Sequence, residues 1–233
     1  MNTKSIDRIY SFYSGFYDLV WNKVFHESRG EGVSLLDLKG GERILDVGVG
    51  TGLSLLFYPN TCKVVGIDFC GAMLQKGRDL ILRNRYSHID LYEMDAMKMD
   101  FPDNHFDAVF SAYTISVVPD PSRVIDEMIR VSKKGGKLVF LNHFKNENRF
   151  ISSCEKMISP LTEKMGFRAD LDLSTLFSGK PVSVDQKHRV KPFNYWNLVS
   201  CTNQKSGDGS GHLISEPVSE QDESFVLADE SGF

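Results

Sequence analysis

A glycine-rich stretch near residue 50 limits the possible folds more than any other part of the chain. The apolar run 44–47 ends at Gly48, and Gly50 and Gly52 follow at two-residue spacing. Such a run is typical of a buried strand, and glycines permit turn conformations that a Cβ would forbid. The unpaired amides at the start of the next element favour polar ligand groups. The stretch therefore predicts a strand and a loop that hold a ligand.

The residues around the loop narrow the choice of ligand. The dinucleotide-binding fingerprint requires glycine or alanine at its sixth position, where this chain has Leu53. Asp46 precedes the glycines, and Asp68 ends the next apolar run, where its carboxylate suits two ribose hydroxyls. Strand, loop, helix, strand and acid together resemble the class I S-adenosylmethionine-dependent methyltransferases. A nucleotide-type fold with an unknown ligand is the alternative.

This resemblance implies a cofactor and a set of residues that bind it. The cofactor is S-adenosyl-L-methionine, with S-adenosyl-L-homocysteine as the product, and no metal is expected. Asp95 and Ala96, just past an expected strand, would read the adenine amino group and shape its pocket, although Asp95 is also consistent with a solvated loop acid. The expected cofactor-binding residues are Tyr17, Asp46, Gly48, Val49, Gly50, Thr51, Gly52, Asp68, Phe69, Met73, Asp95, Ala96, Met97 and Ser111.

Apolar runs and turn residues predict alternating strands and helices. The expected strands are 43–47, 63–67, 89–94, 106–111, 137–142, 181–186 and 192–201. The expected helices are 28–38, 51–57, 70–85, 122–132 with residues 133–136 as its terminator, and 146–177 with a break near Pro160. This order predicts an α/β, Rossmann-like fold: a mostly parallel seven-stranded sheet with helices on both faces and an antiparallel edge. The ligand is expected at the carboxyl ends of the strands.

Composition indicates a globular protein with one main domain, expected over residues 29–203. Of the 233 residues, 41% are hydrophobic and 25% are charged. The 4 cysteines show no CxxC spacing, which favours reduced thiols over a metal site. Neither a run of ~18 apolar residues nor a secretory leader is found, so a cytoplasmic protein is expected.

The net charge of −4 is distributed unevenly. Residues 204–233 carry one Lys and seven Asp or Glu, which leaves 26 basic and 24 acidic residues before them. This small positive balance gives no basic patch of the kind that nucleic-acid binding needs. Residues 204–233 are rich in Gly, Ser, Asp and Glu, and are expected to form a disordered acidic tail.

An aromatic amphipathic helix is expected within residues 1–28. Between Ile6 and Phe25 the apolar residues recur at three- and four-residue steps, and many of them are aromatic. An aromatic stripe suits an interface with one dry and one wet side, so this helix is predicted to act as a lid and a membrane contact. A helix that only packs on the domain would have the same pattern.

Three segments point to a narrower family. Residues 16–21, 141–144 and 160–170 look like those of the soluble-type bacterial phosphatidylethanolamine N-methyltransferases, a similarity that spans most of residues 5–202. That family implies methylation of the phosphatidylethanolamine amine, in up to three steps, toward phosphatidylcholine. The alternatives are a ubiquinone/menaquinone-type C-methyltransferase or other small-molecule methyltransferase, and a module that binds the cofactor without catalysis.

The implied chemistry requires positioning and no covalent nucleophile, because methyl transfer from a sulfonium is an in-line displacement. The amine must lose a proton before attack, and His143 is the candidate base, although it could also orient the substrate phosphate or only pack. Tyr17 and Tyr113 are the other expected catalytic residues, because aromatic faces stabilise a forming cation. The expected substrate-binding residues are Tyr10, Tyr13, Trp21, Tyr113 and His143.

A lipid acceptor implies a membrane partner. An enzyme with such a substrate and no transmembrane span is expected to lie peripherally on an anionic membrane surface. The segment 180–191 adds Lys180, Lys187, Arg189 and Lys191 against Asp185, although a short basic run is also typical of a solvated edge. No nucleic-acid partner is expected, and the protein is expected to be a monomer.

Overall fold

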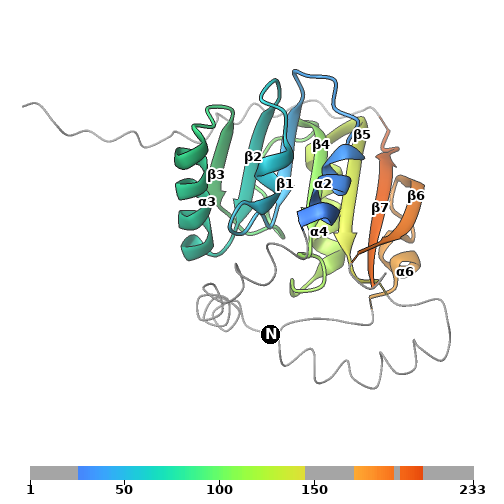
Figure 1. Ribbon diagram of the computed structural model, residues 1–233. Helices are drawn as coiled ribbons and strands as arrows, with labels where there is room; N and C mark the ends of the chain where they lie inside the picture. The colour runs from blue at the N-terminus through green and yellow to red at the C-terminus, as the bar shows by residue number, and fades with distance from the viewer. Residues whose placement is uncertain (1–25, 145–170, 192–194, 207–233) are drawn as a thin grey trace, which may run out of the picture.

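The computed structural model describes residues 26–144, 171–191 and 195–206, which form one seven-stranded sheet flanked by helices (Figure 1). The strands are β1 (Arg43–Val47), β2 (Lys63–Asp68), β3 (Ile89–Glu93), β4 (Phe106–Ala112), β5 (Ser132–Asn142), β6 (Val182–Val190) and β7 (Trp196–Asn203). Their order is β3-β2-β1-β4-β5-β7-β6. The pairs among β1 to β5 are parallel, whereas β7 runs antiparallel to both β5 and β6. The predicted sheet is confirmed, with its antiparallel strand one place in from the edge.

Helices cover both faces of the sheet, as predicted. They are α2 (His26–Ser34), the 3-10 helix η1 (Leu53–Phe57), α3 (Gly71–Asn84), α4 (Pro121–Val131) and α6 (Leu173–Phe177). Successive strand residues point to opposite faces, so the sheet has two hydrophobic cores. Ile44 belongs to the core that includes α2, η1 and α3, whereas its neighbour Leu45 belongs to the core that includes α4 and α6.

The helix expected over 51–57 is present over Leu53–Phe57, and it is of the 3-10 type. Gly52 lies before it in the left-handed region at φ 82°, and Pro59 follows shortly after it. The helix between these two breakers has 5 residues, which is fewer than two turns of a 3-10 helix.

Residues 133–136 do not terminate a helix as expected, because β5 begins directly after α4. Phe106 pairs with Ser132, but Ala108 pairs with Lys137, so the intervening residues of β5 bulge out of the ladder. Other element boundaries differ by a few residues, most clearly those of α2 and β6. α2 spans His26–Ser34 in place of 28–38, and β6 continues to Val190 in place of 186 because it pairs with β7 along its length.

Several sequence predictions lie outside the described residues. They are the amphipathic helix before His26 with Tyr10, Tyr13, Tyr17 and Trp21, most of the helix expected over 146–177, and the acidic tail beyond residue 206. They stay predictions.

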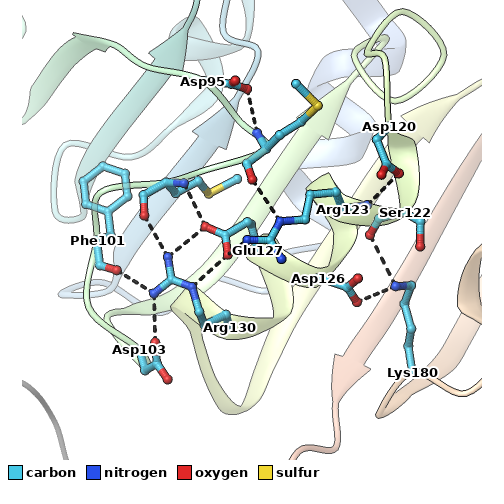
Figure 2. A network of polar contacts seen from close by, with 12 residues as sticks. Asp95, Phe101, Asp103, Asp120, Ser122, Arg123, Asp126, Glu127, Arg130 and Lys180 are labelled. Carbon is cyan, nitrogen blue, oxygen red and sulfur yellow. Dashed lines mark hydrogen bonds and ion pairs between the residues drawn. The ribbon is translucent and has the colours of Figure 1, made fainter.

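A polar network joins α4 to the loop that follows β3 (Figure 2). Arg130 donates hydrogen bonds to the carbonyl oxygens of Met99 (2.8 Å) and Phe101 (2.7 Å), and it forms ion pairs with Asp103 and Glu127. Glu127 is 5% exposed and accepts a hydrogen bond from the Met99 amide at 2.8 Å. Burial alone would raise the pKa of Glu127, but the hydrogen bonds from Arg130 lower it below its ordinary value. The ionised pair therefore ties the loop backbone to the helix.

Arg123 extends this network toward the beginning of the same loop. Its Nε donates to the Met97 carbonyl at 3.1 Å, and the Met97 amide donates to Asp95 at 2.8 Å (Figure 2). The side chain of Asp120 caps α4 by accepting from the Arg123 amide at 3.0 Å. α4 thus fixes the backbone that presents Asp95.

Arg130→Met should lower the free energy of unfolding by about 2–3 kcal/mol, because it leaves the nearly buried Glu127 carboxylate with only its longer ion pair, to the more exposed Arg123 at 3.8 Å. Breaking a fully buried pair costs roughly 3–5 kcal/mol, and the partial exposure of Arg130 reduces this figure. Urea unfolding of both proteins measures the difference. Arg123→Met, which removes a more exposed cation from the same helix, is the control and should cost less than about 1 kcal/mol. Equal losses in the two variants would contradict this account of Glu127.

Candidate functional site

A cavity lies at the carboxyl ends of β1, β2, β3 and β4, where the strand order switches between β1 and β4. Eleven of the expected cofactor-binding residues line it: Asp46, Gly48, Val49, Gly50, Thr51, Asp68, Phe69, Met73, Asp95, Ala96 and Met97. Tyr113, expected in catalysis, also lines it. Gly52 and Ser111 are buried and are not part of the lining, and Tyr17 lies outside the described residues.

The glycine loop wraps around one end of the cavity. Gly48, Gly50 and Gly52 all have positive φ, which explains the two-residue spacing of the motif. At Gly48 space is also limiting, because a Cβ there would lie 2.0 Å from Oγ1 of Thr114. Thr114 in turn donates to the Val47 carbonyl at 3.2 Å, so it fastens the loop to the end of β4. The sequence analysis did not identify Thr114, because nothing in the local pattern links it to the loop.

Asp46 is an almost completely buried carboxylate at the base of the cavity. Its Oδ2 accepts hydrogen bonds from Ser54 and from Tyr58, the latter at 3.0 Å. Burial raises the pKa of Asp46 to about 6, against the opposing effect of these two hydrogen bonds and of the nearby Arg29. Desolvation disfavours the charged form of a carboxylate, which explains the direction of the shift. The site therefore stabilises a cation placed against Asp46.

Asp68 and Asp95 follow the next two strands of the sheet. Asp68 accepts hydrogen bonds from the backbone amides of Gly50 and Cys70, both at 2.9 Å. The Phe69 amide also favours the ionised carboxylate, and a carboxylate has about four lone-pair sites, so Asp68 keeps acceptor capacity for ribose hydroxyls. Burial raises the pKa of Asp68 above its ordinary value. Asp95 is exposed to the cavity, and its turn is held by the Met97 amide.

Tyr113 lies at the far side of the cavity in a strained conformation, with φ 61°. Its hydroxyl shares a hydrogen bond of 2.8 Å with Ser28, and the guanidinium carbon of Arg29 lies 4.9 Å from the centre of its ring. Ser28 and Arg29 belong to α2, and Arg29 lines the cavity. The sequence analysis missed Arg29, because only the packing of α2 on the sheet brings it to the site.

His143 follows β5 and is buried outside the cavity lining. Its Nδ1 lies 3.0 Å from the carbonyl oxygen of Tyr195, and the rings of these two residues stack at 3.9 Å. The ring of Trp196 packs nearly perpendicular to the rings of Tyr113 and His143. The distances between ring centroids are 4.8 Å to Tyr113 and 6.3 Å to His143. Two of the expected catalytic residues, Tyr113 and His143, thus both contact Trp196.

The described residues contain no group of three or more His, Cys, Asp or Glu side chains that could hold a metal ion. Within the same part of the chain, no helix has the length and apolar character needed to span a bilayer. Cys62, Cys70 and Cys201 are buried and form no disulfide bond with one another.

The lining of the cavity fits a nucleoside that carries a charged tail. Asp68 supplies acceptors for sugar hydroxyls, and Met73 and Ala96 supply apolar surface for a base. Asp46 supplies a buried negative charge for a cationic group. These are the chemical features of S-adenosylmethionine, so the residues fit the cofactor that the sequence implies.

Comparison with known proteins agrees with this site. Residues 45–140 match the family described as "Methyltransferase domain". The phosphatidylethanolamine N-methyltransferase of Cereibacter sphaeroides is 34% identical over 193 residues, which cover 82% of this chain and 94% of that protein. The ubiquinone/menaquinone biosynthesis C-methyltransferase UbiE of Pseudomonas putida is 38% identical over 126 residues, which cover 52% of this chain and 49% of that protein. This chain therefore spans about half the length of the second relative.

Solved structures share the fold. A methyltransferase from Methanosarcina mazei has a TM-score of 0.61 at 19% identity, over 72% of this chain and 95% of that one. Geranyl diphosphate C-methyltransferase from Streptomyces coelicolor, solved with S-adenosyl-L-homocysteine, has a TM-score of 0.60 at 12% identity, over 76% of this chain and 80% of that one. The chain has the glycine loop and the acids of the cavity, and it matches one relative along nearly the whole length of that relative. It therefore belongs to the class I S-adenosylmethionine-dependent methyltransferases and is similar to a bacterial phosphatidylethanolamine N-methyltransferase.

Proposed function

We propose that this methyltransferase transfers methyl groups from S-adenosylmethionine to the amine of phosphatidylethanolamine, toward phosphatidylcholine, at a membrane surface. The observation that carries the proposal is the extent of similarity. The phosphatidylethanolamine N-methyltransferase matches over 82% of this chain, whereas the C-methyltransferase match covers 52%. Sequence outside the cofactor-binding half determines the acceptor, because acceptor specificity comes from residues added to a common fold.

A quinone-type C-methyltransferase is the second candidate, favoured by the 38% identity of the shared half. The shared half contains the glycine loop and the acids that line the cavity, and these residues serve any acceptor. A module that binds the cofactor without catalysis is disfavoured, because Asp46, Asp68 and Asp95 all lie in the cavity lining.

Each acid of the cavity has a proposed role. Asp68 binds the two ribose hydroxyls, and Asp95 with Ala96 binds the adenine. Asp46 faces the cationic part of the ligand. When bound, S-adenosylmethionine supplies an electrophilic methyl group on a sulfonium. Tyr113 and Tyr17 present aromatic faces to the positive charge that forms on the acceptor amine, each worth ~0.5–2 kcal/mol.

His143 is proposed to take the proton from the amine. A backbone carbonyl only accepts hydrogen bonds, so the contact with Tyr195 places the proton of a neutral imidazole on Nδ1. Nε2 then carries the basic lone pair. The stacked ring of Tyr195 covers the imidazole, and this role requires that ring to move, which its exposure of 39% permits.

The membrane surface is proposed to contact the aromatic stripe of residues 1–28 and a basic edge. Lys187, Arg189 and Lys191 are exposed on or beside the edge strand β6. Lys180 is not available for this role, because it forms an ion pair with Asp126. Exposed cations near an anionic surface contribute about 1 kcal/mol each.

The decisive assay incubates the protein with labelled S-adenosylmethionine and vesicles that contain phosphatidylethanolamine or its mono- or dimethylated forms. Thin-layer separation should show label in phosphatidylcholine and its intermediates. Label in an added quinol precursor, with none in lipid, would contradict the lipid assignment. Flotation of the protein with anionic vesicles, but not with neutral ones, would support the membrane surface.

Asp68→Ala should weaken S-adenosylmethionine binding by about 10–100-fold, because two ribose hydroxyls lose a charged acceptor, and hydrogen bonds to charged groups are worth ~1.5–3 kcal/mol. Calorimetry on folded protein measures the dissociation constant. Asp90→Ala removes an exposed acid from the neighbouring strand β3 and should leave binding unchanged. An unchanged constant for Asp68→Ala would remove this residue from the site.

Binding of S-adenosylmethionine should weaken as the pH falls below about 6. The free protein then protonates Asp46, whose pKa burial raises to about 6, while the cationic ligand favours the ionised form. The loss should approach tenfold per pH unit. Calorimetry between pH 5 and 8 tests this dependence. Asp46→Asn should bind more weakly with a flat profile, and a wild-type profile that is equally flat would contradict the role of Asp46.

His143→Gln should lower turnover by about 10²–10⁴-fold if the imidazole takes the proton, while cofactor affinity changes little. Single-turnover methylation of lipid and calorimetric binding of the cofactor measure the two quantities separately. A loss below tenfold would return His143 to a packing role. Tyr195→Ala is the informative partner variant, because it uncovers the imidazole and should leave most activity.

A further inference from the structure

Ser28 is a polar residue on the buried face of α2. Its side chain belongs to a residue that is only 2% exposed, and its hydroxyl lies 2.8 Å from the hydroxyl of Tyr113, 85 positions further along the chain. A buried hydroxyl costs free energy unless it is hydrogen-bonded. The partner is a residue that lines the cofactor cavity, so this contact joins α2 to the site.

Two glycines of α2 allow the helix to lie close to the sheet. A Cβ on Gly32 would lie 2.7 Å from the ring of Phe110 in β4, and a Cβ on Gly30 would lie 2.8 Å from the ring of Phe57 in η1. Neither position could take a side chain without a shift of its neighbours. The helix is therefore seated at a short distance from β4, and Tyr113 is the residue that directly follows β4. This packing brings Ser28 to the Tyr113 hydroxyl.

Tyr113 is held at its backbone, at its ring and at its hydroxyl. Its amide donates to the Leu141 carbonyl at 2.7 Å, and its φ of 61° lies in the left-handed region. The ring of Trp196 packs perpendicular to that of Tyr113, and the guanidinium carbon of Arg29 lies 4.9 Å from the ring centre. A strained conformation persists only where the surroundings determine it. The bond to Ser28 adds a contact at the tip of the ring.

We infer that Ser28 is a positioning residue for methyl transfer, which acts by holding the ring of Tyr113 in the orientation that meets the acceptor. The inference rests on the proposed function, in which this ring stabilises the positive charge that forms on the acceptor amine. Such stabilisation requires the cation to lie over the face of the ring. A ring that turns away from this orientation loses part of the contact, and a ring that is ordered before the reaction avoids the loss.

A purely structural Ser28 would hold α2 on the sheet and have no effect on turnover. Removal of a structural bond lowers the free energy of unfolding but leaves the kcat of the folded protein unchanged. Removal of a positioning bond lowers kcat, whereas the KM for the acceptor and the Kd for S-adenosyl-L-homocysteine change little, because the charge on the amine forms only in the transition state. The two roles therefore predict different kinetics.

Ser28→Ala should lower the kcat for methylation of phosphatidylethanolamine by about 2–30-fold, the range that corresponds to one cation–π contact. Tyr113→Phe keeps the ring, removes the other half of the bond and should lose a similar factor. The double variant should lose no more than either single variant, because all three lack the same bond. Ser28→Thr retains a hydroxyl and should restore most of the turnover.

Ser34→Ala is the matched control, because it makes the same substitution at an exposed position of the same helix. The Ser34 hydroxyl donates to the Glu31 carbonyl at 2.6 Å and is not bonded to Tyr113. This variant should leave kcat unchanged. Circular dichroism and thermal unfolding establish that each variant is folded, and calorimetry with S-adenosyl-L-homocysteine measures the Kd of each.

NMR of protein labelled with fluorotyrosine tests the contact without any acceptor. The resonance of Tyr113 is identified by its absence from the spectrum of Tyr113→Phe. It should shift in Ser28→Ala and stay in place in Ser34→Ala. An unchanged resonance in Ser28→Ala would overturn the inference, because the ring would not depend on Ser28.

Additive losses of kcat in the double variant would also overturn the inference, because they would show that Ser28 does not act through Tyr113. An unchanged kcat in folded Ser28→Ala would leave Ser28 with a structural role only. If the wild type methylates an added quinol precursor and no lipid, the lipid assignment fails, and the same variants compared on the quinol decide the inference by the same criteria. A wild type that methylates neither acceptor would overturn the inference together with the proposed function.

Discussion

The hydrogen bond from the Gly50 amide to the Asp68 carboxylate joins the glycine loop of β1 to the end of β2, and the cavity depends on it. The amides of Gly48 and Val49 also donate to the Ile67 carbonyl, at 2.8 and 3.0 Å, so the Gly50 contact completes the connection by holding the loop to the acid itself. The same carboxylate accepts from the Cys70 amide at the start of α3, so one side chain organises a strand end, a loop and a helix. The carboxylate has about four lone-pair sites and therefore keeps acceptor capacity for a ligand. Structure and binding therefore share one residue.

The row of charges along the sheet edge follows from parallel topology. Parallel strands present their carboxyl ends on one side, and each of β1, β2 and β3 has one of the three acids within two residues of its last residue. β4 adds Tyr113, and α2 adds Arg29 above it. A ligand laid along this edge meets a different chemical group about every 4.8 Å. The order of the strands in the sheet, more than the shape of any single loop, thus sets the order of the chemical groups along the ligand site.

The opposite side of the sheet also serves the site. α4 packs on the core that includes Met128, and its polar residues bind the loop between β3 and β4. The buried Glu127 and its partner Arg130 carry most of this connection, because they bond to the loop backbone and not only to each other. The position of Asp95 is in this way determined by a helix that does not line the cavity.

The sequence by itself determined the alternation of strands and helices, the glycine loop and the acids Asp46, Asp68 and Asp95, because each is encoded by contiguous residues with a local pattern. The sequence did not show that the helix after Gly52 is of the 3-10 type, because its type depends on the short space between two helix breakers. It also did not show that residues 133–136 form a bulge of β5, because that depends on pairing with β4. Only the tertiary structure decided that Arg29 and Ser28 meet Tyr113. These residues are about 85 positions apart, and no periodicity connects them. Burial of His143 beneath Tyr195 has the same cause, since separate strands bring the two rings together.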